Sequence, residues 1–342
     1  MTVYKIRQFA AIFMSCILSA QTYAQQHKTT FQFVETAPEN IRNIMQNNAN
    51  ALFDEIHRAY RQNESALSIK NVTAEAEKRI KSIWETSHFY CSKAGICVKR
   101  ILAQKKSNGA LEKYQVRNIP VFFEQGNSDE EQYQEIVIEF TPDGKICDMY
   151  NAISIHQYGV IMDGSNEVGD FRQREIILGF VENFKTAYNV KDMNYLQKVY
   201  SDDALIITGR VLQNKTGDIP HVRSDKNRDL IYSSESKKQY LDRLGRIFKN
   251  NNYVNIQFDE IEVMRNEGNN HIYGVTLKQS WTTKPSEKSA GGYHDDGWLF
   301  LLIDYENEDT PTVWVRTWQP LTDGNGNEIG REQVFSTYDF PF

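Results

Sequence analysis

The stretch "VYSDDALIITG", residues 199–209, decides the fold, because a helical pattern of apolar residues ends in it and a strand pattern starts in it. Upstream, apolar side chains recur at the spacing of one helix face; they are Ile176, Ile177, Phe180, Val181, Phe184 and Tyr188. Downstream, after a polar segment, the sequence returns to a helix and then to four long strands. The stretch therefore predicts a turn from a helix into a sheet.

Both halves of the 342-residue chain repeat one order of elements. Two helical patterns, over 39–67 and 73–87, are followed by β-rich runs as far as residue 158. Two more helices, over 170–204 and 233–251, are followed by strands over 253–266, 271–284, 297–307 and 311–321. This repetition predicts an internal duplication, with an N-terminal α+β domain over 39–158, a linker over 158–170, a C-terminal α+β domain over 170–320 and a tail over 321–342.

The second half resembles the nuclear-transport-factor-2-like (NTF2-like) superfamily, which includes ketosteroid isomerases and SnoaL-type polyketide cyclases. The resemblance rests on the helix over 180–188, on "KDMNYLQKVYSDDALIITG" over 191–209 and on "VWVRTWQP" over 313–320. It covers 170–320, whereas the first half matches only in the order of its elements. It implies two tandem cone-shaped (cystatin-like) α+β domains, with helices packed on a curved antiparallel sheet. The whole chain also resembles exported tandem-domain proteins of Bacteroidetes.

The chemistry of the isomerases is not expected here. The resemblance implies a general base a few residues after "DDA" and a tyrosine on the first helix that donates to the developing oxyanion. Counting along this sequence puts Thr208 at the base and Phe184 at the tyrosine. Threonine is no carboxylate base, and phenylalanine has no proton to donate. We interpret Asp202 and Asp203 as structural residues of the turn.

The strand over 311–321 carries a candidate ligand site, because alternation puts Trp314, Arg316 and Trp318 on one face. An arginine between two indoles suits a carboxylate or sulfate beside an apolar or sugar ring. Alternatively, the aromatic rings belong to the core and Arg316 pairs with an internal acid. The other residues expected at the site are Gln279, Trp281, Trp298, His294, Phe184 and Tyr188.

Three functions are compatible with this pattern. An aromatic inner surface without a paired acid and base favours a non-catalytic module that holds a small amphipathic ligand or a peptide in the second cone. An isomerase, dehydratase or cyclase is the alternative, with His294 and Asp295 or Asp296 as unusual catalytic groups. A third hypothesis is a scaffold with filled cones, either a homodimer or a pseudo-dimer within one chain.

The N-terminus predicts export. Lys5 and Arg7 precede an apolar run and a small-residue exit that ends at Ala24, which is the pattern of a signal peptide over 1–24. We expect a soluble periplasmic or secreted protein, without a transmembrane segment. Removal of the two leader cations changes the formal net charge from −6 to −8, which makes nucleic acid an unexpected partner.

The cysteines leave two readings open. A Lys-Ala-Gly turn can place Cys91 opposite Cys97 in a bulged hairpin, where a disulfide is geometrically possible; alternatively both are reduced and buried. Cys147 has no partner, and no His or Asp lies at metal-ligand spacing from it. The sequence also lacks a P-loop, GxGxxG, HExxH or GxSxG motif, so we expect no metal and no cofactor.

Overall fold

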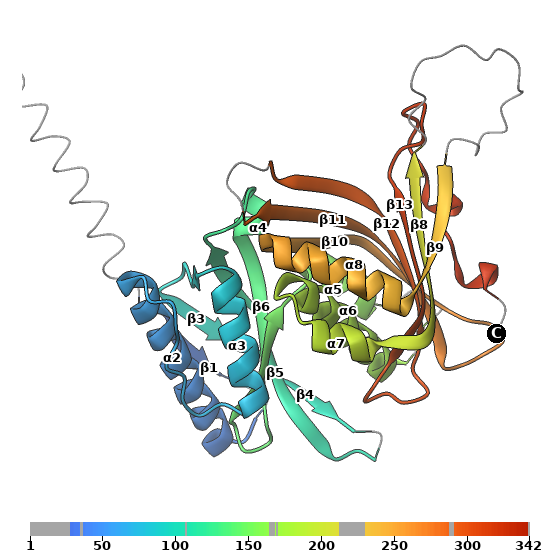
Figure 1. The fold of residues 1–342 in the computed structure, drawn as a ribbon. Helices are drawn as coiled ribbons and strands as arrows, with labels where there is room; N and C mark the ends of the chain where they lie inside the picture. The colour runs from blue at the N-terminus through green and yellow to red at the C-terminus, as the bar shows by residue number, and fades with distance from the viewer. Residues whose placement is uncertain are drawn as a thin grey trace, which may run out of the picture. The chain divides into compact units, whose positions relative to one another are not determined.

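The computed structural model describes residues 28–34, 37–106, 108–163, 168, 170–211, 230–286 and 291–340. The expected signal peptide over 1–24 lies outside these residues. The chain divides into two compact units, Met1–Ala152 and Ile153–Phe342 (Figure 1). Within the described residues, no helix is long and apolar enough to cross a membrane.

The first unit has helices that precede an antiparallel sheet. Its elements are β1 (Thr30–Phe33), α2 (Glu39–Gln62), α3 (Ala74–Thr86), β2 (Phe89–Tyr90), β3 (Gly95–Val98), β4 (Leu102–Lys105), β5 (Leu111–Phe123), α4 (Asp129–Gln132), β6 (Tyr133–Phe140) and β7 (Ile146–Asn151). The sheet has the strand order β2-β5-β6-β7, and β4 also pairs with β5. Thr73 caps α3 as expected, since its hydroxyl accepts from the backbone N–H of Ala76.

The expected cysteine hairpin is wrong. Strand β3 pairs in parallel with β1, with Cys97 opposite Gln32, and it does not pair with β2. Cys91 is buried, Cys97 is exposed, and both are free thiols, as is Cys147. The turn between the two cysteines predicted that β3 pairs with β2, whereas β3 pairs with β1, which lies far away in the sequence. A short turn motif cannot reveal such a non-local pairing.

The second unit is a curved six-stranded sheet with helices on one face (Figure 1). Its elements are α5 (Ile155–Asp163), α6 (Phe171–Asn189), α7 (Met193–Val199), β8 (Tyr200–Val211), β9 (Leu230–Ser236), α8 (Lys237–Asn250), β10 (Asn251–Arg265), β11 (Ile272–Pro285), β12 (Tyr293–Asp304), β13 (Thr312–Pro320) and two short 3-10 helices, η1 (Arg331–Gln333) and η2 (Thr337–Asp339). The strand order is β10-β11-β12-β13-β8-β9, antiparallel except for the β13–β8 pair.

The turn in the opening stretch is confirmed, since α7 ends at Val199 and β8 begins at Tyr200. Two other local expectations differ from the structure. Residues 155–163 form helix α5 within the second unit, where the sequence indicated a strand end and the start of the linker. Strand β9 was missed, because its run "LIYSSES" alternates weakly and leads directly into the capping box of α8, formed by Ser236 and Gln239.

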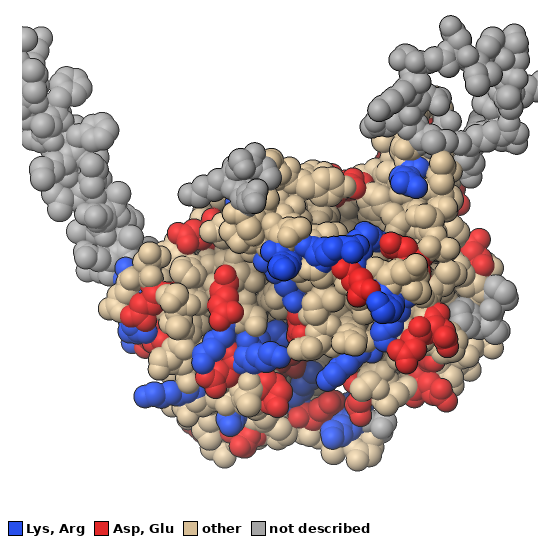
Figure 2. Space-filling model, in the orientation of Figure 1, with Lys and Arg blue, Asp and Glu red and all other residues tan. Residues whose placement is uncertain are grey.

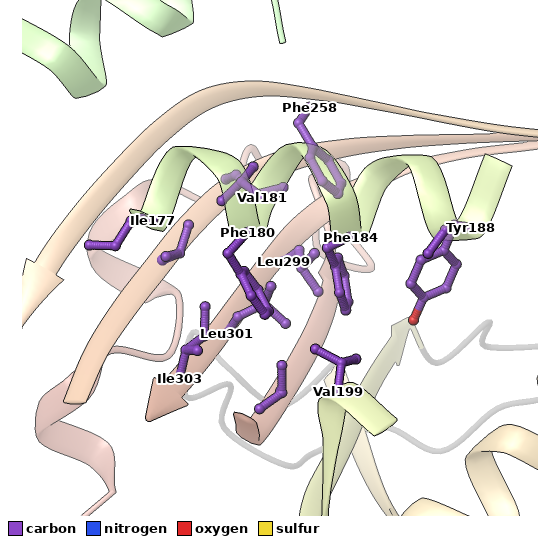
Figure 3. Packing of buried hydrophobic residues seen from close by; sticks show 14 of the residues in the cluster. Ile177, Phe180, Val181, Phe184, Tyr188, Val199, Phe258, Leu299, Leu301 and Ile303 are labelled. Carbon is purple, nitrogen blue, oxygen red and sulfur yellow. The ribbon is translucent and has the colours of Figure 1, made fainter. Parts of the chain in front are cut away.

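The two faces of this sheet are buried by different segments. The inner face packs on α6, α7 and α8 around residues such as Phe184, Leu299 and Leu301 (Figure 3). The outer face carries a second cluster around Trp298 and Phe300, which the C-terminal segment covers; its covering residues are Leu321, Ile329, Val334, Phe335 and Phe340. Residues 321–340 of the expected tail over 321–342 are therefore an integral part of the second unit.

Candidate functional site

Aromatic side chains of helix α6 point toward the concave side of the sheet, here called the cone. Phe180, Phe184 and Tyr188 lie four residues apart and so share one face of the helix. The Phe180 and Phe184 rings stack at 5.8 Å between centroids, and the Phe184 and Tyr188 centroids are 5.0 Å apart. Figure 3 shows Phe184 and Tyr188 pointing from α6 toward β8 and the inner strands. The helix thus builds an aromatic wall that ends in a phenol.

Three tyrosine hydroxyls meet inside the cone. The Tyr188 hydroxyl lies 2.8 Å from that of Tyr200 on β8 and 2.5 Å from that of Tyr240 on α8. Burial raises the pKa of Tyr188 and of Tyr200 well above the usual 10.0, so both remain protonated at neutral pH. This cluster can therefore donate hydrogen bonds to an anion, but it cannot act as a base under ordinary conditions.

Arg316 on β13 lies beside this tyrosine cluster. Its side chain is buried, with 6% of the residue exposed, and its guanidinium carbon lies 5.1 Å from the Tyr240 ring centroid. Burial alone would lower its pKa, but the oxygens of Tyr240, Tyr188 and Tyr200 raise the pKa above the usual value, so the cation persists. Among the described residues no carboxylate pairs with it, and its buried Nε has no hydrogen-bond partner.

Such a charge is unusual, because buried cations are normally paired with an acid. The alternative from the sequence, an internal acid for Arg316, is not found within the described part of the chain. A guanidinium that is buried away from bulk water attracts an anion more strongly than an exposed one does. The arrangement of Arg316 and the tyrosine cluster therefore suits the head group of a small anion.

Three more of the expected residues face the cone. Trp281 pairs with Ile256 and Trp318 with Leu299, both of which belong to the inner core, so the register turns the two indoles inward. Gln279 is buried two residues before Trp281 on the same face. Trp281 meets Tyr188 edge-on at 5.8 Å, and both indoles remain partly exposed. These two partly exposed indoles, here called the rim, lie on the face of the sheet that carries Arg316.

Close approach of strand β12 sets the position of the Trp318 ring. A Cβ built at Gly297 would lie 2.5 Å from ring atoms of Trp318. Any larger residue would place its Cβ in the space that the Trp318 ring occupies, so this ring position requires a glycine at 297.

Trp314, Trp298 and His294 do not belong to this site. A bulge between Leu302 and Ile303 shifts the register of β13, so Trp314 leaves the face of Arg316 and is 40% exposed. Trp298 packs in the outer cluster, and its indole N–H donates to the carbonyl of Ile329 at 2.9 Å. The expectation that Trp314, Trp298 and His294 line the cone is therefore wrong.

The residues of the alternative catalytic group are separated by strand alternation. His294 contacts Thr282 through Nδ1 at 3.0 Å and Asp296 through Nε2 at 3.2 Å, on the side of β12 that carries Trp298. Asp295 pairs with Trp281 and so faces the other way. The imidazole is largely solvent-exposed on the outer face, so His294 and Asp296 lie outside the cone and apart from Asp295. Within the described residues no cluster of three or more His, Cys, Asp or Glu side chains could hold a metal ion.

Thr208 and Phe184 are the positions to which counting along the sequence assigned the isomerase groups. Thr208 pairs with Trp318 beside the rim, and Phe184 packs in the aromatic wall. Tyr188, one helical turn after Phe184, carries the hydroxyl that enters the cone. Tyr200 and Tyr240 were missed, although Tyr200 stands in the opening stretch; two aromatic residues on separate elements give no local signal that they will meet.

Replacing Tyr188 by Phe is expected to destabilise the protein more than replacing Tyr200 by Phe. The Tyr188 hydroxyl bridges the other two, so its loss leaves both without their partner, at a cost of about 1–3 kcal/mol. Loss of the Tyr200 hydroxyl breaks one contact and should cost about 1 kcal/mol. Urea unfolding measures both changes; equal values would show that Tyr188 is not the bridge.

Alkaline solution should reveal the buried phenols as one cooperative step. Burial raises the pKa of Tyr188, Tyr200 and Tyr305 above the unfolded value of about 10, so their contribution to stability is complete below pH 10 and is lost above it. We expect stability to fall above pH 10 and the phenolate absorbance of these three residues to appear only on unfolding. Ionisation of all tyrosines before the loss of circular dichroism would contradict this expectation.

Comparisons with known proteins concern the fold. No protein-family model and no curated protein sequence matches the chain. Among solved structures, a proposed scytalone dehydratase from Novosphingobium aromaticivorans matches at 8% identity and TM-score 0.33, over 43% of this chain and 83% of that one. A proposed dehydratase of the NTF2-like family from Streptomyces avermitilis matches at 11% identity and TM-score 0.30, over 43% and 96%.

A third match is naphthalene 1,2-dioxygenase with indole bound in its active site, at 8% identity and TM-score 0.36, over 54% of this chain and 92% of that one. The matches are to NTF2-like folds over about half of the chain.

Proposed function

We propose that the second unit is a non-catalytic module that binds a small organic anion with an aromatic or apolar body inside its cone. The observation that carries this proposal is the buried guanidinium of Arg316, which has no carboxylate partner among the described residues and lies against three phenolic hydroxyls. A buried charge without an oppositely charged partner lowers the stability of the folded protein, and an anionic ligand would neutralise it.

A carboxylate is the head group that fits best. It carries one charge, as Arg316 does, and guanidinium and carboxylate form paired hydrogen bonds of matching geometry. The protonated tyrosine cluster adds neutral donors beside this pair. The partly exposed indoles of Trp281 and Trp318 offer aromatic surface on the same inner face of the sheet. An aromatic monocarboxylate would contact both groups of residues.

The test is a titration of the protein with benzoate, phenylacetate and naphthoate, followed by tryptophan fluorescence. The matching alcohols serve as uncharged controls. Saturable binding of an acid, but not of its alcohol, is expected for the wild type, and Arg265→Met, which removes an exposed arginine of β10, should bind equally well. Wild-type and Arg316→Met proteins that respond alike to every compound would overturn the proposal.

We also propose that the protein is exported and that its first unit is a second NTF2-like domain. The leader over 1–24 supports export, and the two helices before an antiparallel sheet support the tandem arrangement. Mass spectrometry of the protein from a cell-envelope fraction should find Gln25 as the first residue. A chain that keeps Met1 and stays in the cytoplasm would refute export.

A further inference from the structure

The second unit contains a hollow away from the tyrosine cluster. It has a volume of about 300 Å³ and lies between α5, the first turns of α6 and the later part of β10. Ile177 at this hollow precedes Tyr188 by eleven residues on one helix, which corresponds to about 16 Å at the rise of an α-helix. The hollow is therefore a separate site from the cone.

Its walls are aliphatic; they are formed by Val160, Ile161, Val168, Ile177, Ile261 and Val263. None of the described lining residues is aromatic, in contrast to the cone. These walls therefore offer no ring on which an aromatic ligand could stack. A flexible aliphatic chain is the type of ligand that they can contact closely.

The described lining also contains three charged residues, Arg174, Glu262 and Arg331. Two of them, Arg331 and Glu262, form an ion pair. Arg331 donates to a carboxylate oxygen of Glu262 at 2.9 Å and to the carbonyl of Glu260 at 2.7 Å. Its guanidinium also lies 5.5 Å from the ring centroid of Trp298. This arginine is therefore neutralised and fixed in place.

Arg174 is the remaining charge. Its guanidinium carbon lies 5.8 Å from the Phe171 ring centroid, and its buried Nε has no hydrogen-bond partner. Within the described residues it pairs with no carboxylate, whereas Arg172 on the same turn binds Glu308 at 2.6 Å. Among the described residues, the hollow therefore carries one positive charge without a carboxylate partner, on a partly buried side chain beside aliphatic walls.

We infer that this hollow binds a monocarboxylate with a short unbranched aliphatic chain, the chemistry of a medium-chain fatty acid, with its carboxylate on Arg174. The single free charge matches one carboxylate, and the aliphatic lining matches the chain. The volume lies at the lower end of the range of about 300–1,000 Å³ seen for small-molecule pockets, which excludes a bulky body.

The test is calorimetric titration of the full chain with sodium octanoate, with octanol as the uncharged probe. Wild-type protein should bind octanoate saturably and leave octanol unbound. Arg174→Gln should weaken octanoate binding tenfold or more, while the matched variant Arg172→Gln should bind as the wild type does. Arg316→Met should also retain octanoate binding, so this inference and the proposed function fail or succeed separately.

A second variant keeps the inference testable if Arg174→Gln fails to fold. Val160 is 46% exposed at the edge of the hollow, so Val160→Phe fills the space without entering the core. It should abolish octanoate binding and leave the melting temperature unchanged. Absence of saturable binding to the wild type, equal affinity for octanol, or equal affinities of the Arg174→Gln and Arg172→Gln variants would each overturn the inference.

Discussion

Arg316→Met is expected to raise the melting temperature of the ligand-free protein and to weaken binding of the anion. The native cation is buried without a carboxylate partner among the described residues, and it loses hydration on folding. Replacing buried ionic groups with well-packed hydrophobic residues of similar volume is often neutral or stabilises a protein by about 1–4 kcal/mol, and an unpaired cation favours the stabilising end of that range. For a unit of this size such a gain corresponds to a rise of roughly 5 °C in melting temperature.

The same variant should lower affinity for an aromatic carboxylate about a hundredfold, because it removes a buried charge-assisted contact. Calorimetry of unfolding and a binding titration measure the two effects. Arg316→Lys is the matched control: it keeps the charge but lacks the planar fork, so it should bind more weakly than the wild type without the gain in stability. A fall in melting temperature for Arg316→Met would mean that the guanidinium holds the fold together.

Deletion of residues 321–342 should destabilise the second unit by several kcal/mol. The segment covers the outer cluster of the sheet, and its removal exposes Trp298 and Phe300, which are 3% and 1% exposed in the intact chain. Burial of one large apolar side chain is worth about 1.5–3 kcal/mol, and the indole N–H of Trp298 also loses its acceptor at Ile329.

Urea unfolding of the truncated chain, together with binding of a hydrophobic dye, measures this change. The matched control is Tyr338→Ala, which alters a ring that is 66% exposed within the same segment and should change stability by less than about 0.5 kcal/mol. A truncated chain as stable as the intact one would show that the segment only lies on the surface.

The sequence predicted those elements whose signals are local. Helix α3 begins after the capping hydroxyl of Thr73, and the turn at Val199 and Tyr200 lies where the helical period changes into a strand. Strand alternation placed Arg316 and Trp318 on one face of β13, as in the structure, but did not say which side of the sheet that face is. These features depend on residues a few positions apart, so a pattern in the chain can record them.

Features that depend on distant contacts were not predicted. A bulge on β13 breaks the alternation between Trp314 and Arg316, and nothing in "VWVRTWQP" marks it. Strand β1 pairs with β3, although α2, α3 and β2 lie between them in the sequence. The hairpin that local turn residues predicted for Cys91 and Cys97 therefore does not form. The tyrosine cluster joins α6, β8 and α8, and only the folded arrangement brings the three hydroxyls together.

The most direct test of the account is the NMR resonance of the Arg316 Nε–H group, assigned by its absence from Arg316→Met. In the ligand-free protein the buried Nε has no hydrogen-bond partner. Addition of an aromatic carboxylate that binds should shift this resonance downfield, as expected for a charge-assisted hydrogen bond, and leave the Nε–H of Arg331 unmoved. A ligand that saturates the protein without changing the Arg316 resonance would contradict the central claim.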